Sequence, residues 1–164
     1  MKSAAFVATA FAIAIVALYS MLITRAVTPS LPLGLYIRTL GNVHRGSIVL
    51  FGMPKTLRPY FETVGGIRFF DNPRNGFLKP IAAVEGDHVC SDGETLAING
   101  RLVAIADRTI PHGEKLPTWI FCGQLGRGEI LPISTHSKNS IDGRYYGAIR
   151  VEDAAPFAPL YTWE

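Results

Sequence analysis

The stretch TLAINGRLVAI, Thr95 to Ile105, decides the fold class, because its two apolar arms flank the dipeptide Asn99-Gly100. An Asn-Gly pair between apolar segments is the strongest short-range signal for a β-hairpin. Three further runs are short, apolar or alternating, and bounded by turn residues, namely GSIVLF (46–51), FLKPIAAV (77–84) and GEILPIS (128–134). Together these runs predict a mainly β fold.

The rest of the chain adds turns rather than helices. Gly86-Asp87 marks a further turn, and no window after Arg25 holds a 3.6-residue apolar period over three turns. The stretch 53–76 is interpreted as a long irregular excursion, and the tail 155–164 contains too many prolines for a helix. We therefore predict a single β domain over residues 26–164.

Residues 1–25 precede this domain and differ from it in composition. Ser3 to Thr24 carries no charged residue, and as a helix these 22 positions would span roughly 33 Å, enough to cross a bilayer core. We favour an uncleaved transmembrane anchor, because the nearest small-x-small site has Arg25 inside it. A cleaved signal helix is the alternative, since an alanine-rich run inserts only modestly well. In both cases the β domain is exported.

Charge, cysteine and histidine content argue against several kinds of site. The net charge is +3 and no basic stripe is present, so we predict no nucleic-acid partner. The small excess of positive charge suits an anionic membrane surface only weakly. Two cysteines are too few for a Cys-only metal site, and the four histidines form no H-E-x-x-H motif. We predict neither a metal nor a cofactor.

Cys90 and Cys122 are the two cysteines of the chain. In an oxidising compartment they are best interpreted as one disulfide, which stabilises the fold by roughly 3 to 4 kcal/mol on the loop-entropy model. Two buried thiols are the alternative. A catalytic cysteine is disfavoured, because neither residue has the required histidine partner pattern.

A single serine stands out directly after the apolar run. In TPSLPLGLY, residues 28–36, Ser30 lies between Pro29 and Pro32, with Gly34 just beyond. Prolines stiffen the backbone on both sides of the hydroxyl. Ser30 is therefore either a linker residue at the membrane exit or a nucleophile.

Lys79 is unusual because it lies in the apolar run 77–84, where neither face of a strand would be polar. Burial disfavours the ammonium form and can lower a lysine pKa by several units, which would provide a general base near neutral pH. The alternative is an edge-strand lysine that extends to solvent, with Pro80 marking the edge. Because Ser-Lys pairs are a known variant of the serine nucleophile and its base, Ser30 and Lys79 together favour catalysis.

The order of the motifs resembles type I signal peptidases, and most closely their TraF branch, the peptidases of conjugative transfer systems. The resemblance covers nearly all of the chain after the apolar run. The motifs that carry it are SLP (30–32) with GLY (34–36), HRGSIVLF (44–51), LKPIAAVEGDHV (78–89), INGRLV (98–103) and NSIDGRYYGAI (139–149). The resemblance implies a signal-peptidase-like β domain behind one N-terminal helix.

The resemblance also implies roles for single residues. Ser30 matches the nucleophile and Lys79 its general base, while Thr28 matches the hydroxyl that holds the oxyanion together with the Ser30 N–H. Ser140 matches a hydroxyl that orients the lysine. Asp142 and Arg144 match an ion pair beside the site, and the TraF branch treats this aspartate as catalytically important. Tyr145, Tyr146 and Gly147 match the aromatic pair and the glycine that follow.

Other readings of these residues remain open. Asp142 and Arg144 could form an ordinary surface pair, and Ser140 and Thr28 could be plain loop hydroxyls. Trp119 is interpreted as a core residue near the proposed disulfide. The chain departs from many family members at Pro80, where they carry Arg, and at Gly46-Ser47, where they carry Gly-Asp. Pro80 puts the strand pairing beside the lysine in doubt.

The activity implied is that of a Ser-Lys serine endopeptidase anchored in the bacterial inner membrane, with its catalytic domain in the periplasm. Its substrate would be an exported, signal-bearing precursor, most specifically a conjugative pilin, which some family members also cyclise. A general type I signal peptidase is one alternative. A non-catalytic β scaffold, tethered to the membrane within a secretion or conjugation apparatus, is another.

Overall fold

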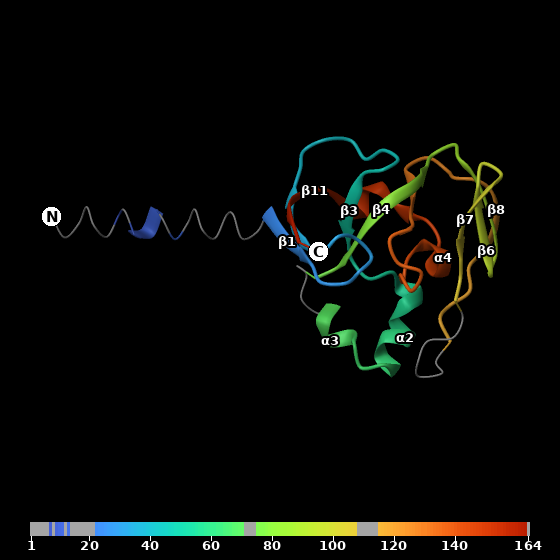
Figure 1. Ribbon diagram of the computed structural model, residues 1–164, viewed down its shortest axis with the longest axis horizontal. Coiled ribbons are helices and arrows are strands. Elements are labelled where there is room, and N and C mark those ends of the chain that lie inside the picture. Colours follow the sequence, from blue (N-terminus) through green and yellow to red (C-terminus); the bar gives the residue numbers. More distant parts are fainter. Residues whose placement is uncertain are drawn as a thin grey trace.

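The computed structural model describes Val7, residues 9–11, Ile13 and the ranges 22–70, 75–107 and 115–163. Two antiparallel sheets make up the domain (Figure 1). The seven-stranded sheet has the order β1 (Ile23–Ala26), β2 (Gly34–Arg38), β11 (Ala154–Thr162), β3 (Ile48–Phe51), β4 (Phe77–Val84), β9 (Glu129–Pro132) and β10 (Ile149–Arg150). The four-stranded sheet has the order β7 (Arg101–Ile105), β6 (Thr95–Ile98), β5 (His88–Asp92) and β8 (Ile120–Gln124). The prediction of a mainly β fold is confirmed.

The predicted hairpin is formed by β6 and β7. Asn99 and Gly100 connect the two strands, and both have positive φ, 51° and 78°. This is the backbone that a two-residue hairpin loop requires, and Asn and Gly tolerate it best. The other predicted turn is present as well, since Gly86 has φ 84° and the Asp87 N–H donates to the Val84 carbonyl.

One two-stranded ribbon joins the two sheets. β4 continues through the Gly86-Asp87 turn into β5, and β8 returns into β9, so that β4 pairs with β9 and β5 with β8. Between the sheets the ribbon stays hydrogen-bonded, because Leu125 accepts from the Gly86 N–H at 3.0 Å and donates to the Asp87 carbonyl at 2.9 Å. Lys79 therefore lies on the strand that ties the sheets together.

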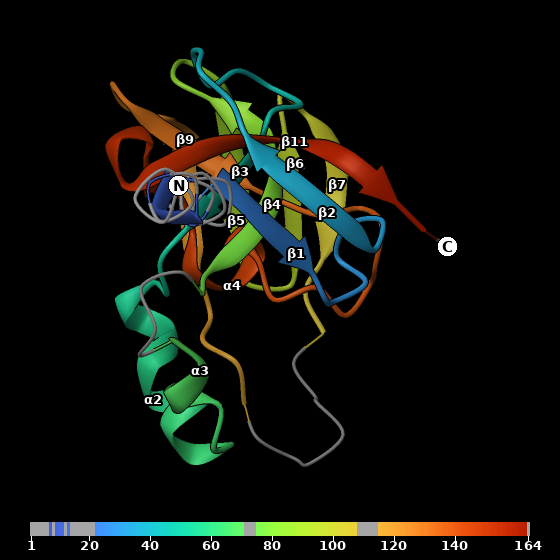
Figure 2. The ribbon, with the colours of Figure 1, turned by 90° about the vertical axis from the view of Figure 1, so that its left-hand side faces the viewer.

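Short helices complete the fold, and several of them lie where the sequence predicted an irregular excursion. Residues 53–76 contain a 3₁₀ turn (Lys55–Leu57), α2 (Arg58–Thr63) and α3 (Ile67–Phe70), which project together from one side of the seven-stranded sheet (Figure 2). Neither helix reaches three turns, so no helical period could be recognised in the sequence. Another short helix, α4 (Gly143–Tyr146), and a 3₁₀ turn (Val151–Asp153) precede β10 and β11 respectively.

The proline-rich tail is a strand and not a loop. β11 lies between β2 and β3, with Pro156 opposite Val49 and a register shift just after Pro159. Two prolines exclude a helix, as predicted, but a bulged strand accommodates them.

The proposed membrane anchor falls largely outside the described residues. Within the described ranges, no helix is both long enough and apolar enough to cross a bilayer. Ile23 to Arg25, which the sequence assigned to the anchor segment, belong to β1 and pair with β2.

Candidate active site

Ser30 lies in the connection between β1 and β2 and is 5% exposed. Two hydrogen bonds tie this connection to its surroundings at the second proline and just after it. The Tyr36 hydroxyl donates to the Pro32 carbonyl at 2.8 Å, and the Trp163 N–H donates to the Leu33 carbonyl at 2.9 Å. The hydroxyl of Ser30 is therefore presented by a stiff, anchored turn rather than by a free linker.

Lys79 lies in the interior of the seven-stranded sheet. β4 is flanked by β3 and β9, Lys79 is opposite Val49, and its side chain is 4% exposed. The alternative of an edge-strand lysine reaching solvent is therefore wrong. Pro80 has no N–H to donate to the ladder, and it is tolerated because the register between β4 and β9 shifts just beyond it; its carbonyl still accepts from the Ile133 N–H.

The structure brings Ser30, Lys79 and Ser140 into one hydrogen-bonded group. Lys79 Nζ lies 2.5 Å from Ser30 Oγ and 2.9 Å from Ser140 Oγ, and the two hydroxyl oxygens are 3.3 Å apart. All three side chains are buried. The hydroxyl and the amine are therefore within reach for proton transfer, and a second hydroxyl orients the amine.

The environment of Lys79 favours its neutral form. Burial lowers the pKa of Lys79 from 10.5 to about 8. The negative charge of Asp142 opposes this change and raises the pKa, whereas the positive charge of Arg144 lowers it further. A much larger share of the amine is unprotonated near neutral pH than for an exposed lysine.

Asp142 and Arg144 form a buried pair at the start of α4. Asp142 is 0% exposed and Arg144 4%, so the alternative of a surface pair is wrong. Asp142 Oδ1 accepts from Arg144 Nε at 2.8 Å and Oδ2 accepts from Arg144 Nη2 at 3.0 Å, which is a bidentate contact. The carboxylate also caps α4 by accepting from the Arg144 backbone N–H.

Arg144 extends this pair to the neighbouring segments. Its guanidinium donates to the carbonyls of Ile105 on β7, Lys138 and Ser134, at 3.0, 3.2 and 2.8 Å. The ion pair thus joins the four-stranded sheet to the loop that carries Ser140. Every buried charge here has hydrogen-bond partners, which a stable buried ion pair requires.

Ser134 contacts the active site although the sequence did not single it out. Its hydroxyl donates to the Ser30 carbonyl, and its backbone N–H donates to Asp142 Oδ2 at 2.9 Å. It is the last residue of the run GEILPIS and lies two positions beyond β9. A serine after an apolar strand carries no distinguishing signal, so only the tertiary contact identifies it.

A cleft of about 550 Å³ leads to the Ser-Lys pair. Ser30, Lys79 and the predicted oxyanion residue Thr28 line it together, and Thr28 is exposed. One wall is aromatic and comes mainly from the helical excursion, with Phe61, Phe69, Phe70 and Phe77 as its members. A cleft of this size with apolar walls can hold several residues of an extended peptide next to Ser30.

The aromatic wall is a connected cluster. Phe70 packs against Phe61 at 4.9 Å between ring centroids and stacks on Phe77 at 5.0 Å. Phe69 contacts Phe70 edge to face and remains 48% exposed. Phe61, Phe70 and Phe77 therefore support the wall, while Phe69 offers its ring to the cleft.

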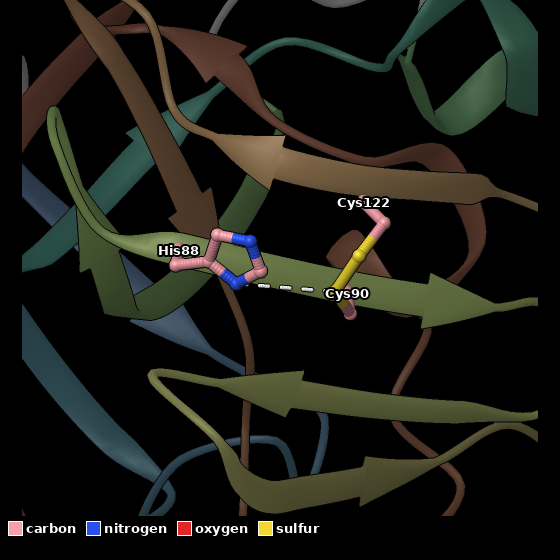
Figure 3. Close-up of side chains that lie close together, drawn as sticks. All are labelled: His88, Cys90 and Cys122. Atoms are coloured by element: carbon pink, nitrogen blue, oxygen red, sulfur yellow. Dashed lines mark hydrogen bonds between the residues drawn. A yellow bond between two sulfur atoms is a disulfide. The ribbon is translucent and has the colours of Figure 1, made fainter.

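The two cysteines form the predicted disulfide between β5 and β8, where Cys90 and Cys122 occupy directly opposite positions (Figure 3). The alternative of two buried thiols is wrong. His88, two residues before Cys90, points toward the sulfurs, with Nδ1 3.9 Å from Cys90 Sγ. Trp119 packs against the core as predicted and is partly buried there, with its ring stacked on Phe121 at 5.2 Å and its carbonyl accepting from Ser91.

Comparison with known proteins finds a family model, curated relatives and a solved structure that match. The family model described as signal peptidase, peptidase S26, matches residues 1–163. Two proteins from Escherichia coli, each described as plasmid transfer protein TraF, are 30% identical to this chain. The first aligns over 145 residues, covering 83% of this chain and 81% of the relative, and the second over 147 residues, covering 83% and 80%. Among solved structures, a signal peptidase I from Enterococcus faecalis is 19% identical with a TM-score of 0.37, and the match covers 71% of this chain and 96% of that one.

Proposed function

The chain belongs to the signal peptidase family, peptidase S26, and from this premise we propose that it is a serine endopeptidase with a Ser30-Lys79 dyad. The observation that carries the proposal is the buried Lys79 amine, 2.5 Å from the Ser30 hydroxyl. A buried lysine with a lowered pKa beside a serine on a rigid turn has the geometry of a base and its nucleophile.

The reaction follows from this geometry. Neutral Lys79 takes the proton of Ser30 as Oγ attacks the scissile carbonyl carbon, and the resulting ammonium then protonates the leaving amine. Ser140 accepts from Lys79 and keeps the amine directed at Ser30. Water or another amine attacks the acyl-enzyme and regenerates the Ser30 hydroxyl.

The oxyanion of the tetrahedral intermediate is assigned to the Ser30 N–H and the Thr28 hydroxyl. Thr28 lies two residues before the nucleophile and lines the same cleft, which supports this role. One preorganised donor of this kind contributes about 3 kcal/mol to transition-state stabilisation.

The substrate we propose is an exported, signal-bearing precursor, and specifically a conjugative pilin. The curated relatives are described as plasmid transfer proteins, and the cleft next to Ser30 has an apolar wall suited to an uncharged peptide segment. Cyclisation of the product would need only that an amino group replaces water at the acyl-enzyme. A general signal peptidase would use the same dyad with a broader range of precursors.

We place the enzyme in the bacterial inner membrane, with the N-terminal apolar segment ahead of β1 as its anchor and the β domain, from Ile23 onward, in the periplasm. The apolar run 3–24 supports an anchor, and a disulfide is typical of proteins in an oxidising compartment. Such an anchor would keep Ser30 near the membrane face where precursors emerge.

The test is precursor processing in membranes that carry Ser30→Ala, Lys79→Ala or Lys79→Arg. All three changes should abolish cleavage, Lys79→Arg included, because a guanidinium stays protonated and cannot act as the base. Lys55→Ala and Ser91→Ala are matched controls, since Lys55 is exposed and Ser91 bonds to Trp119 in the other sheet. Mass spectrometry of a candidate pilin would separate uncut, cut and circular products. Cleavage that persists without Ser30 would instead support the non-catalytic scaffold.

A further inference from the structure

Ser134 is fully buried and uses each of its polar groups in a contact at the active site. The hydroxyl donates to the Ser30 carbonyl. The backbone N–H donates to Asp142 Oδ2 at 2.9 Å, and the carbonyl accepts from Arg144 Nη2 at 2.8 Å. Ser134 therefore binds the nucleophile's own backbone on one side and both members of the ion pair on the other.

This double attachment matters because Ser30 lies on a turn outside the sheets. The Ser30 side chain is held by Lys79 and Ser140, but those contacts change when Ser30 loses its proton and attacks. The contact from Ser134 is made to the Ser30 backbone, which takes no part in the proton transfer. It can hold the turn in place throughout the reaction, and a shift of about 1 Å at a reacting atom can lower a rate about 100-fold.

The other end of the attachment is rigid. Asp142 is 0% exposed and accepts from Arg144 and Ser134, while Arg144 also donates to carbonyls of Ile105 and Lys138. A buried ion pair with all its hydrogen bonds satisfied has few alternative arrangements. A residue that is hydrogen-bonded to this ion pair, as Ser134 is, is therefore held in one position.

We propose that Ser134 is a positioning residue that fixes the backbone of Ser30 to the buried Asp142–Arg144 pair and so keeps the Ser30 hydroxyl against Lys79. The inference rests on the proposed Ser-Lys function. Ser134 does not touch the reacting atoms, and its effect is transmitted through the Ser30 carbonyl.

The experiment follows the titration of the Lys79 amine by NMR in the full chain labelled with ¹⁵N-lysine, which needs no substrate. Ser134→Ala removes the donor, so the turn should move away from Lys79 and water should reach the amine. The Lys79 midpoint is then expected to rise from about 8 toward 10.5, its value when unburied. Ser134→Thr keeps the hydroxyl and should restore the midpoint.

Ser91→Ala is the matched control, because Ser91 is also buried and its hydroxyl also donates to a backbone carbonyl, that of Trp119. It should lower the melting temperature about as much as Ser134→Ala but leave the Lys79 midpoint unchanged. If Ser134→Ala does not fold, Ser134→Cys, which is close in size but a weak donor, takes its place. A wild-type midpoint in whichever of these two variants folds would overturn the proposal.

A kinetic measurement separates this inference from the proposed function. With a precursor that the wild-type protein cleaves, Ser134→Ala should lower kcat roughly 10- to 100-fold and change KM less than about twofold, because the aromatic wall of the cleft does not belong to the turn that moves. If kcat and KM both match those of Ser91→Ala, Ser134 is only structural. If Ser30→Ala still cleaves, the proposed function fails, whereas the Lys79 titration still decides the position of Ser134.

Discussion

At the scale of single residues, Lys79 illustrates how the position of a lysine in a sheet changes the pKa of its amine. The same side chain on an edge strand would reach water and keep an ordinary pKa. Between β3 and β9 it is 4% exposed, and burial lowers its pKa to about 8. Asp142 keeps the pKa from falling further, because its negative charge favours the ammonium form. The balance leaves the amine able both to accept a proton and to return it.

A pH dependence of kcat/KM follows from the lowered pKa of Lys79. Only the neutral amine can take the Ser30 proton, so kcat/KM should rise with pH as Lys79 loses its proton and should level off above the pKa. Half of the maximal rate is expected near pH 8. Initial rates of peptide cleavage between pH 6 and 10 would measure it. A rate that falls from pH 6 to 9 would contradict the assignment of Lys79 as the base.

At the scale of elements, α4 shows how a single turn of helix can carry a site. Asp142 caps its first turn and Arg144 lies within it, so the helix presents both charges at a fixed separation. Gly143 permits close packing, because a Cβ there would lie 2.7 Å from the Pro132 carbonyl oxygen on β9. The ion pair is therefore held directly against the strand next to β4.

Asp142→Asn is expected to have two effects of different kinds. It leaves the buried Arg144 guanidinium without its counter-charge, which should lower the free energy of unfolding by about 3 to 5 kcal/mol. It also removes the charge that raises the Lys79 pKa, so the midpoint of the Lys79 titration should fall below 8. Urea unfolding measures the first effect and NMR titration the second. A midpoint that rises instead would show that water has entered the site.

The α2–α3 excursion gives a separate prediction about substrate binding. Phe69 faces the cleft and is 48% exposed, so Phe69→Ala should raise KM roughly 10-fold with kcat little changed and stability nearly unaffected. Leu102→Ala is the control, because Leu102 is also an exposed apolar residue, 63%, but lies on β7 and outside this cleft. Equal KM values for the two variants would show that the α2–α3 excursion does not contribute to substrate binding.

At the scale of the whole molecule, the two sheets depend on each other through the β4–β5 and β8–β9 ribbon. The disulfide between Cys90 and Cys122 closes this ribbon on the side of the four-stranded sheet. It thereby joins β8 covalently to β5. Stability of the smaller sheet should therefore affect the whole domain.

Reduction of the disulfide is expected to lower the melting temperature. On the loop-entropy model the cross-link contributes roughly 3 to 4 kcal/mol, which corresponds to a decrease on the order of 10 °C for a domain of this size. Calorimetry with and without a phosphine reductant measures it. In the Cys90→Ser, Cys122→Ser double variant the reductant should have no effect. An unchanged melting temperature in the reduced wild-type protein would contradict the prediction.

The sequence by itself determined the features that depend on neighbouring residues. Asn99-Gly100 predicts its hairpin because those two residues tolerate positive φ, and the apolar runs predict β3, β4 and β9 because strand patterns are local. An uncharged strand around Lys79 and a proline-stiffened Ser30 were enough to suggest a base and a nucleophile. Export and an even number of cysteines predicted the disulfide.

Only the tertiary structure decided which polar groups are buried and what they contact. Asp142 and Arg144 look like a surface pair in sequence, and their burial follows from packing against β9 and β7. Ser134 gains its importance from a contact to Ser30, 104 positions away. The helices of the 53–76 excursion and the strand β11 are too short or too rich in proline to show a period. Desolvation and hydrogen bonding are set by groups that are distant in the chain, and no local pattern records them.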